Sequence, residues 1–218
     1  MTKNFQKFQR IRPKTLGQKD LWDALHEKDI QYVAISGPPG TGKSFLTCYY
    51  AAKELEKNPN IEKISICRSV TPIKGEEIGF LKGGVGEKMA EWLVPMTSNL
   101  KTFLPDYGEY VYKGAIEVIP LAMARGRSFE YTVVIADEAQ NLSLETFEML
   151  LTRIADSSKL IVLGDFKQND RRGDTTDFEK VCGALDGMDA FKWIQLDWED
   201  CIRSKNIREI SERLDEII

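Results

Sequence analysis

The sequence is poor in the residues that build metal centres and disulfide scaffolds. It contains four cysteines and one histidine in 218 residues. The cysteines are widely spaced and form no C-x-x-C pair, which argues against both disulfide bonds and a zinc site and predicts reduced thiols in the core. The histidine, His26, has no partner cluster in the sequence, and we expect it at the surface near a helix end.

Long apolar runs are also missing. No stretch approaches the roughly 20 apolar residues that span a bilayer, and the N-terminus lacks the apolar segment of a signal peptide. We therefore expect a cytoplasmic protein with no membrane association. The apolar fraction of 42% and the charged fraction of 29% are ordinary for a globular protein, and the length suits one domain.

An overall excess of positive charge is absent as well. The formal net charge is −4, so the chain as a whole has no affinity for nucleic acid through charge alone. Basic residues nevertheless gather in residues 1–14, which contain no acid and carry Phe5 and Phe8 between the lysines and arginines. Such an arm could lie along a phosphate backbone, or it could be a solvated terminus. We divide the chain into this basic arm (1–14) and a single domain (15–218).

One glycine-rich motif dominates the sequence, Gly37-Pro38-Pro39-Gly40-Thr41-Gly42-Lys43-Ser44. A short apolar run (32–35) precedes it, and residues 45–55 follow with helical spacing, which together give the strand, turn and helix of a phosphate-binding P-loop. The glycines let successive N–H groups close around an anion at the positive end of the new helix. Lys43 would reach the β- and γ-phosphates, and Ser44 would ligate magnesium. The predicted nucleotide-binding residues are these eight together with Phe45.

Two later strands deliver acids and amides at their ends. Residues 131–136 form a buried-strand pattern that leads into Asp137 and Glu138, the position at which P-loop enzymes hold magnesium and polarise the attacking water. Residues 159–163 form another strand, followed by Gly164, Asp165 and Gln168, where a glutamine can sense the γ-phosphate or orient the water. We expect an extra strand between those that carry the P-loop and Asp137.

Several basic residues are candidates for contacts with a polymer or with phosphate. Arg68, Thr71 and Lys74 follow a predicted strand (61–67) and could touch a nucleic-acid backbone, or they could be solvated loop residues. Arg125 and Arg127 follow a strand (115–119) and could serve phosphate or nucleic acid, or pair with surface acids. Arg203 follows a strand (191–196) and could stabilise phosphoryl transfer, or form a structural salt bridge.

Helical spacing predicts four further helices, over residues 15–25, 87–104, 143–155 and 206–217. Ser143 is the predicted N-cap of the third.

The ordered motifs resemble the PhoH family of ATPases, whose P-loop domain is similar to the first motor domain of superfamily 1 helicases. The resemblance runs from Gln18 to Arg203, and its most specific elements are Asp137-Glu138-Ala139-Gln140-Asn141 and Gly164-Asp165 with Gln168 and Asp170. It implies Gln18 near the adenine, hydrolysis through Glu138, γ-phosphate contacts from Gln168, and Arg203 as an arginine finger. The chain departs from the family at Ser69, where proline is usual, and in the acidic stretch 174–177.

We therefore expect an α/β fold: a single RecA-like P-loop NTPase domain with a mostly parallel sheet between helices on both faces. The predicted function is Mg-dependent ATP hydrolysis coupled to action on RNA or DNA. Because a superfamily 1 helicase closes two motor domains around ATP and this chain has residues for one, we expect a homo-oligomer, in the form of a ring such as a hexamer, in which an arginine of the neighbouring subunit completes the site. The alternatives are a P-loop kinase for a small metabolite and a nucleotide-switched interaction protein.

Overall fold

The computed structural model describes residues 11–68, 94–166 and 176–215. These residues form one sheet of six parallel strands. The strands are β1 (Tyr32–Ser36), β2 (Lys63–Arg68), β3 (Ile116–Pro120), β4 (Thr132–Asp137), β5 (Lys159–Gly164) and β6 (Phe191–Gln195).

The strand order is β3-β2-β4-β5-β1-β6. Strand β5 therefore lies between β1, which leads into the glycine-rich motif, and β4, which ends at Asp137; this confirms the predicted extra strand. Because all the strands run in the same direction, their carboxyl ends meet at one edge of the sheet. The glycine-rich motif, Arg68, Asp137 and Asp165 consequently emerge at that edge.

Three helices cover one face of the sheet: α1 (Leu16–His26), α2 (Lys43–Lys57) and α4 (Val94–Phe103). Their apolar residues pack with alternate strand residues such as Ile35, Ile66 and Ile135 in one buried cluster. Helix α5 (Tyr107–Tyr112) lies beside β3 and packs Tyr107 and Tyr110 against the same cluster. The predicted helix over 87–104 is confirmed for residues 94–103, and its earlier part lies outside the described residues.

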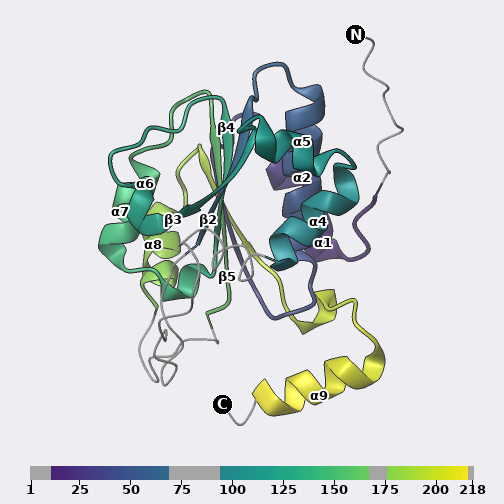
Figure 1. The fold of residues 1–218 in the computed structure, drawn as a ribbon. Coiled ribbons are helices and arrows are strands. Elements are labelled where there is room, and N and C mark those ends of the chain that lie inside the picture. The colour runs from purple at the N-terminus through teal and green to yellow at the C-terminus, as the bar shows by residue number, and fades with distance from the viewer. Residues whose placement is uncertain (1–10, 69–93, 167–175, 216–218) are drawn as a thin grey trace, which may run out of the picture.

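The opposite face is covered by α6 (Leu121–Ala124), α7 (Leu144–Leu151) and α8 (Asp177–Leu185). Phe147 and Phe178 stack there at 5.8 Å between ring centroids. They pack on the strand residues whose side chains point to this second face, such as Val134. Figure 1 shows the sheet between these two helix layers. Two helix layers around a parallel sheet match the predicted α/β architecture.

Two helix ends differ in how well the sequence predicted them. The Ser143 side chain caps α7 by accepting from the Thr146 N–H, as predicted. The helix, however, ends at Leu151 and not at residue 155, and Ile154 beyond it forms a parallel bridge with Phe129. Helix α9 (Lys205–Asp215) corresponds to the helix predicted over residues 206–217. It lies apart from both helix layers (Figure 1).

The four cysteines are buried and unpaired, which confirms the prediction of core thiols. The prediction for His26 is confirmed for the helix end and only in part for the surface position. His26 ends α1 but is half-buried: its ring stacks on Trp22, Nδ1 donates to the Trp22 carbonyl, and Nε2 accepts from Lys53 at 3.0 Å. Burial is the main reason why its pKa lies below the usual value. Among the described helices, none is long and apolar enough to cross a membrane.

Candidate active site

The glycine-rich loop after β1 depends on glycine at three positions. Gly37, Gly40 and Gly42 have φ of 146°, 88° and 88°, in the region that side chains disfavour. A Cβ at Gly37 would also lie 2.4 Å from the Leu196 carbonyl oxygen. Helix α2 begins at Lys43 directly after the loop, so its first N–H groups and positive dipole end face the loop. This geometry suits a bound phosphate.

The Lys43 side chain folds back over the loop that precedes it. Its ammonium donates to the carbonyl oxygens of Gly37 and of Pro38, the latter at 2.8 Å. Burial lowers the pKa of Lys43, while the charges of Asp165 and Asp137 act in the opposite direction. Lys43 lines the same cavity as these two carboxylates, which stand at the ends of β4 and β5.

The end of β4 presents two carboxylates. Burial, and next the charge of Glu138, raise the pKa of Asp137 to about 6. Glu138 itself has φ of 58°, an unusual left-handed conformation for a residue with a side chain. Its Oε1 accepts from the Arg68 guanidinium at 3.2 Å, and its Oε2 accepts from the Gln140 amide at 2.7 Å. Both carboxylate oxygens of Glu138 are thus engaged.

These groups surround one cavity of about 430 Å³ at the carboxyl edge of the sheet. The charged residues that line it are Lys43, Arg68, Asp137, Glu138, Asp165 and Arg203. The structure therefore brings together the predicted nucleotide-binding residues from Pro39 to Phe45, the predicted metal ligands Ser44 and Asp137, and the predicted catalytic residues Lys43, Glu138 and Arg203. Three other predicted nucleotide-binding residues, Gln18, Gly37 and Pro38, do not line this cavity.

The donor set fits magnesium. The described residues contain no cluster of three or more His, Cys, Asp or Glu side chains that could hold a metal ion. The Ser44 hydroxyl and the Asp137 carboxylate are hard oxygen donors on the same cavity, and magnesium typically takes one or two protein oxygens together with phosphate and water. A cation here would be bound by these protein oxygens and also by an oxygen of the bound phosphate.

Residues 196–203 run alongside the glycine-rich loop and position Arg203. The Leu196 N–H donates to the Ser36 carbonyl, and the Ile202 N–H donates to the Gly40 carbonyl at 3.1 Å. The Arg203 side chain crosses Gly40 so closely that a Cβ there would lie 2.8 Å from its Cδ. Arg203 is therefore brought to the cavity by its own chain.

Asp200 connects this segment to α1. Its buried carboxylate accepts from the Thr15 hydroxyl, from the Gly17 N–H at 3.1 Å and from the Asp197 N–H at 3.2 Å. It thereby holds the N-terminus of α1, which carries Gln18, next to the segment that carries Arg203.

Gln18 lies against the loop. Its side chain is buried, its Nε2 donates to the Thr41 carbonyl at 2.9 Å, and its Oε1 accepts from the Lys14 N–H at 2.9 Å. The predicted contact with adenine stays a prediction, and the observed contact supports the loop from the side of α1.

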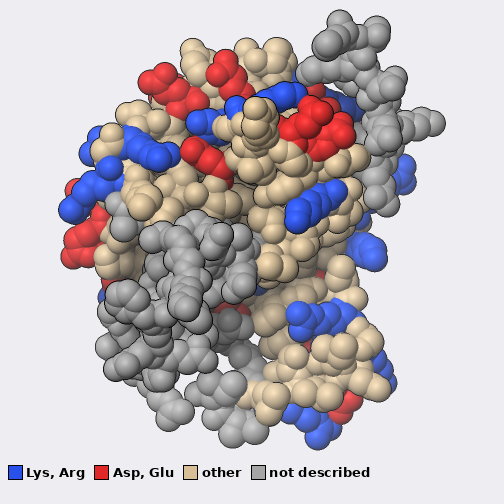
Figure 2. All heavy atoms as spheres, in the orientation of Figure 1, with Lys and Arg blue, Asp and Glu red and all other residues tan. Residues whose placement is uncertain are grey.

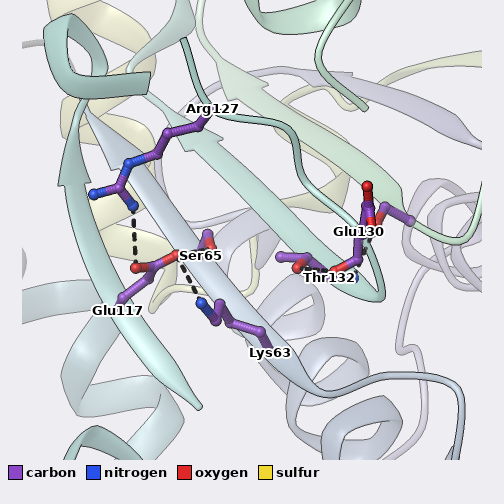
Figure 3. Close-up of polar contacts among 7 residues, drawn as sticks. Lys63, Ser65, Glu117, Arg127, Glu130 and Thr132 are labelled. Carbon is purple, nitrogen blue, oxygen red and sulfur yellow. Dashed lines mark hydrogen bonds and ion pairs between the residues drawn. The ribbon is translucent and has the colours of Figure 1, made fainter. Parts of the chain in front are cut away.

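The basic candidates have different environments. Arg68 ends β2 and forms the ion pair with Glu138 described above. Arg125 is exposed. Arg127 instead pairs with Glu117 at 3.3 Å, and Glu117 also accepts from Ser65 at 2.7 Å and lies 3.6 Å from Lys63. Figure 3 shows Arg127, Lys63 and Ser65 converging on this one carboxylate. Of the two roles considered for Arg127, the structure therefore shows the ion pair with a surface acid.

Three predicted residues lie outside the described part of the chain: Thr71, Lys74 and Gln168. Conversely, the structure adds two residues to which sequence reasoning gave no role. Asp165 is buried on the cavity, and Gln140 contacts Glu138. Both residues belong to motifs that are visible in the sequence. Their positions on the cavity and beside Glu138, however, are known only from the structure.

Comparison with known proteins identifies the family. The family model for the PhoH-like protein matches residues 10–215. A PhoH-like protein of Bacillus subtilis is 37% identical over 218 residues, which cover 99% of this chain and 67% of that relative. A PhoH-like protein of Mycobacterium tuberculosis is 34% identical over 203 residues, covering 92% of this chain and 56% of that relative. The chain thus spans only part of the length of these relatives.

The fold has solved counterparts. The large terminase of a thermophilic bacteriophage, in complex with ADP, superposes with a TM-score of 0.61 at 12% identity, over 93% of this chain and 50% of that chain. At this identity the likeness concerns the fold alone.

Proposed function

Because the chain belongs to the PhoH-like protein family, we propose that it is an ATPase that hydrolyses Mg-ATP at the cavity beside the glycine-rich loop. One observation carries this proposal: Lys43, Asp137 and Glu138 come from different elements and line the same cavity at the N-terminus of α2. A bound phosphate there would meet backbone N–H groups, a lysine and a carboxylate pair. The bound ADP of the bacteriophage terminase is consistent with a nucleotide in this fold.

Each residue has a defined part in the proposed hydrolysis. Lys43 and the loop N–H groups bind the β- and γ-phosphates, and Ser44 and Asp137 hold the cation. Magnesium, when bound, neutralises charge on the phosphates. Glu138 orients the water and accepts its proton as the water oxygen bonds to the γ-phosphorus and the bond to ADP breaks. Arg203, which lies across Gly40, stabilises the charge that develops, in the same chain.

We further propose that RNA or DNA is the partner of this ATPase. The support is the resemblance of the P-loop domain to the first motor domain of superfamily 1 helicases, the basic arm, and the exposed Arg125. On the face shown in Figure 2, Lys and Arg alternate with Asp and Glu over the described residues. A polymer on that face would therefore depend on a few basic positions and not on a continuous stripe.

Adding single-stranded RNA or DNA should raise the rate of ATP hydrolysis by the full chain. Since the contacts are with phosphate, we expect the stimulation to weaken as salt increases. The measurement is phosphate release against polymer concentration at two salt concentrations, with a polyanion such as heparin as the control for charge alone. Turnover that both polymers leave unchanged would contradict the nucleic-acid proposal while leaving the ATPase proposal intact.

Helix α9 supports the proposal of a homo-oligomer. Ile207, Ile210 and Leu214 recur at helical spacing and are 47%, 59% and 51% exposed. The helix stands apart from the sheet (Figure 1), and its face in Figure 2 is largely uncharged, with both basic and acidic side chains at its margins. An apolar stripe of this spacing is typical of helices that pair. Because Arg203 reaches the cavity of its own chain, this assembly need not supply that arginine from a neighbour.

Replacing Ile210 with glutamate should therefore lower the mass of the protein in solution to that of a monomer, since a charge in a helix pair is costly to bury. The measurement is light scattering after size-exclusion chromatography, with and without ATP. Lys205→Glu, at an exposed position outside the apolar stripe, is the matched control for added negative charge. A wild-type protein that is monomeric under both conditions would contradict the oligomer.

The alternative functions make different demands. A metabolite kinase would transfer the γ-phosphate to an acceptor other than water, and a nucleotide-switched interaction protein would not need Glu138. The engagement of Glu138 at the cavity by Arg68 and Gln140 favours hydrolysis over both.

A further inference from the structure

Gln140 connects the end of β4, where Glu138 lies, to the end of the neighbouring strand β5. It belongs to the short 3₁₀ helix η1 (Ala139–Asn141) directly after β4. Its Nε2 donates to Glu138 Oε2 at 2.7 Å, and its Oε1 accepts from the Asp165 N–H, at the end of β5, at 3.1 Å. One side chain therefore joins the carboxylate of Glu138 to the backbone that follows β5.

The surroundings of this amide leave it little freedom. Gln140 is 8% exposed. A Cβ at Gly164 would lie 3.0 Å from Gln140 Oε1, so the glycine provides the space in which the amide packs. Since one end of the amide must face a donor and the other an acceptor, the two hydrogen bonds also determine which way it points.

Glu138 needs such support. Its backbone is in the left-handed region at φ of 58°, a conformation that persists only where the surrounding structure enforces it. Its other oxygen, Oε1, accepts a hydrogen bond at 3.2 Å from the guanidinium of Arg68, the last residue of β2. The carboxylate is thus held from two sides, by a cation from β2 and by a neutral amide anchored to β5.

We propose that Gln140 is a positioning residue for the hydrolytic reaction, which holds the Glu138 carboxylate toward the attacking water and ties its orientation to the end of β5. This inference rests on the proposed ATPase function. Gln140 touches neither phosphate nor cation in this role; it acts through Glu138. Its loss should impair the chemical step and spare nucleotide binding, because its hydrogen bonds hold Glu138 and β5 and none of them is made to the glycine-rich loop or to Lys43.

The test compares Gln140→Met with wild type in steady-state ATP hydrolysis and in direct titration with a fluorescent ATP analogue. Methionine keeps the length and volume of the side chain and removes both hydrogen bonds. We expect kcat to fall by about 10- to 100-fold, the size of effect that a misplaced catalytic group produces, while the dissociation constant of the analogue stays close to the wild-type value. Gln31→Met is the matched control, because it also removes the hydrogen bond of a side-chain amide, here from Gln31 to the Ala155 carbonyl at 2.8 Å. Gln31 lies just before β1, at the opposite end of that strand from the loop.

The outcomes distinguish the two proposals. A wild-type protein that does not hydrolyse ATP would overturn the proposed function itself. An active wild type with an equally active Gln140→Met variant would overturn the role of Gln140 alone, as would a parallel loss of nucleotide affinity and turnover, which indicates a merely structural amide. If the methionine variant unfolds, Gln140→Glu keeps the acceptor for the Asp165 N–H and removes the donor to Glu138, and the same fall in kcat is expected.

Discussion

Replacing Glu138 with glutamine is expected to lower the rate of ATP hydrolysis by about 10²- to 10⁴-fold, the contribution that general bases typically make. Glutamine has nearly the same shape but cannot accept the proton of the attacking water. Lys43, Ser44 and Asp137 are unchanged in this variant, so ATP binding should persist.

The size of the effect is measured as phosphate release, and the retained affinity as the titration of a fluorescent ATP analogue. Glu148→Gln is the matched control, because Glu148 is an exposed carboxylate on α7, away from the cavity. If Glu138→Gln turned over ATP at the wild-type rate, Glu138 would not be the general base of the reaction.

Replacing Lys43 with alanine is expected to weaken ATP binding at least about tenfold, since hydrogen bonds to charged groups contribute about 1.5–3 kcal/mol each. The change also removes a cation from the neighbourhood of Asp165, Asp137 and Glu138. The remaining carboxylates would then repel the triphosphate. Hydrolysis should consequently fall further than binding does.

The two effects are separated by titrating the variant with the ATP analogue and by measuring turnover at saturating ATP. Lys192→Ala, at an exposed lysine on β6, controls for the loss of one positive charge. Thermal unfolding checks that Lys43→Ala is folded. Wild-type affinity in a folded Lys43→Ala variant would show that the nucleotide binds elsewhere.

The geometry of the glycine-rich loop could be predicted from the sequence because the residues that form it are close together in the chain. The glycines, the lysine and the serine follow one another closely in the chain, and an apolar run before them marks the strand. The same holds for Asp137 and Glu138 at the end of an apolar run. Parallel strands then bring these ends to one edge of the sheet, which is a general property of the fold.

Contacts between distant segments could not be predicted in the same way. Arg127 pairs with Glu117, and Glu117 accepts from Ser65 because the parallel register of β2 and β3 places these two residues opposite each other. Arg203 reaches Gly40 because residues 196–202 bond to the backbone of the loop and of the strand before it. Neither the register nor these bonds leave a pattern in the local sequence.

The roles of amide side chains were the hardest to predict. Gln18 and Gln140 are both buried, and each is defined by one donor and one acceptor within hydrogen-bonding range. A glutamine has no charge to attract a partner over distance, so its function depends on which groups the fold places beside it. For Gln18 that group is the carbonyl of Thr41, and for Gln140 it is the carboxylate of Glu138.

The most direct test of the proposed function follows the γ-phosphate of ATP through the reaction. The purified full chain is incubated with magnesium and with ATP labelled on the γ-phosphate, alone and with a mixture of small metabolites, and the labelled products are separated. We predict inorganic phosphate as the product in both cases, at a rate that magnesium chelation abolishes. Label transferred to a metabolite, or no release of phosphate at all, would contradict the proposal that this chain is an ATPase whose acceptor is water.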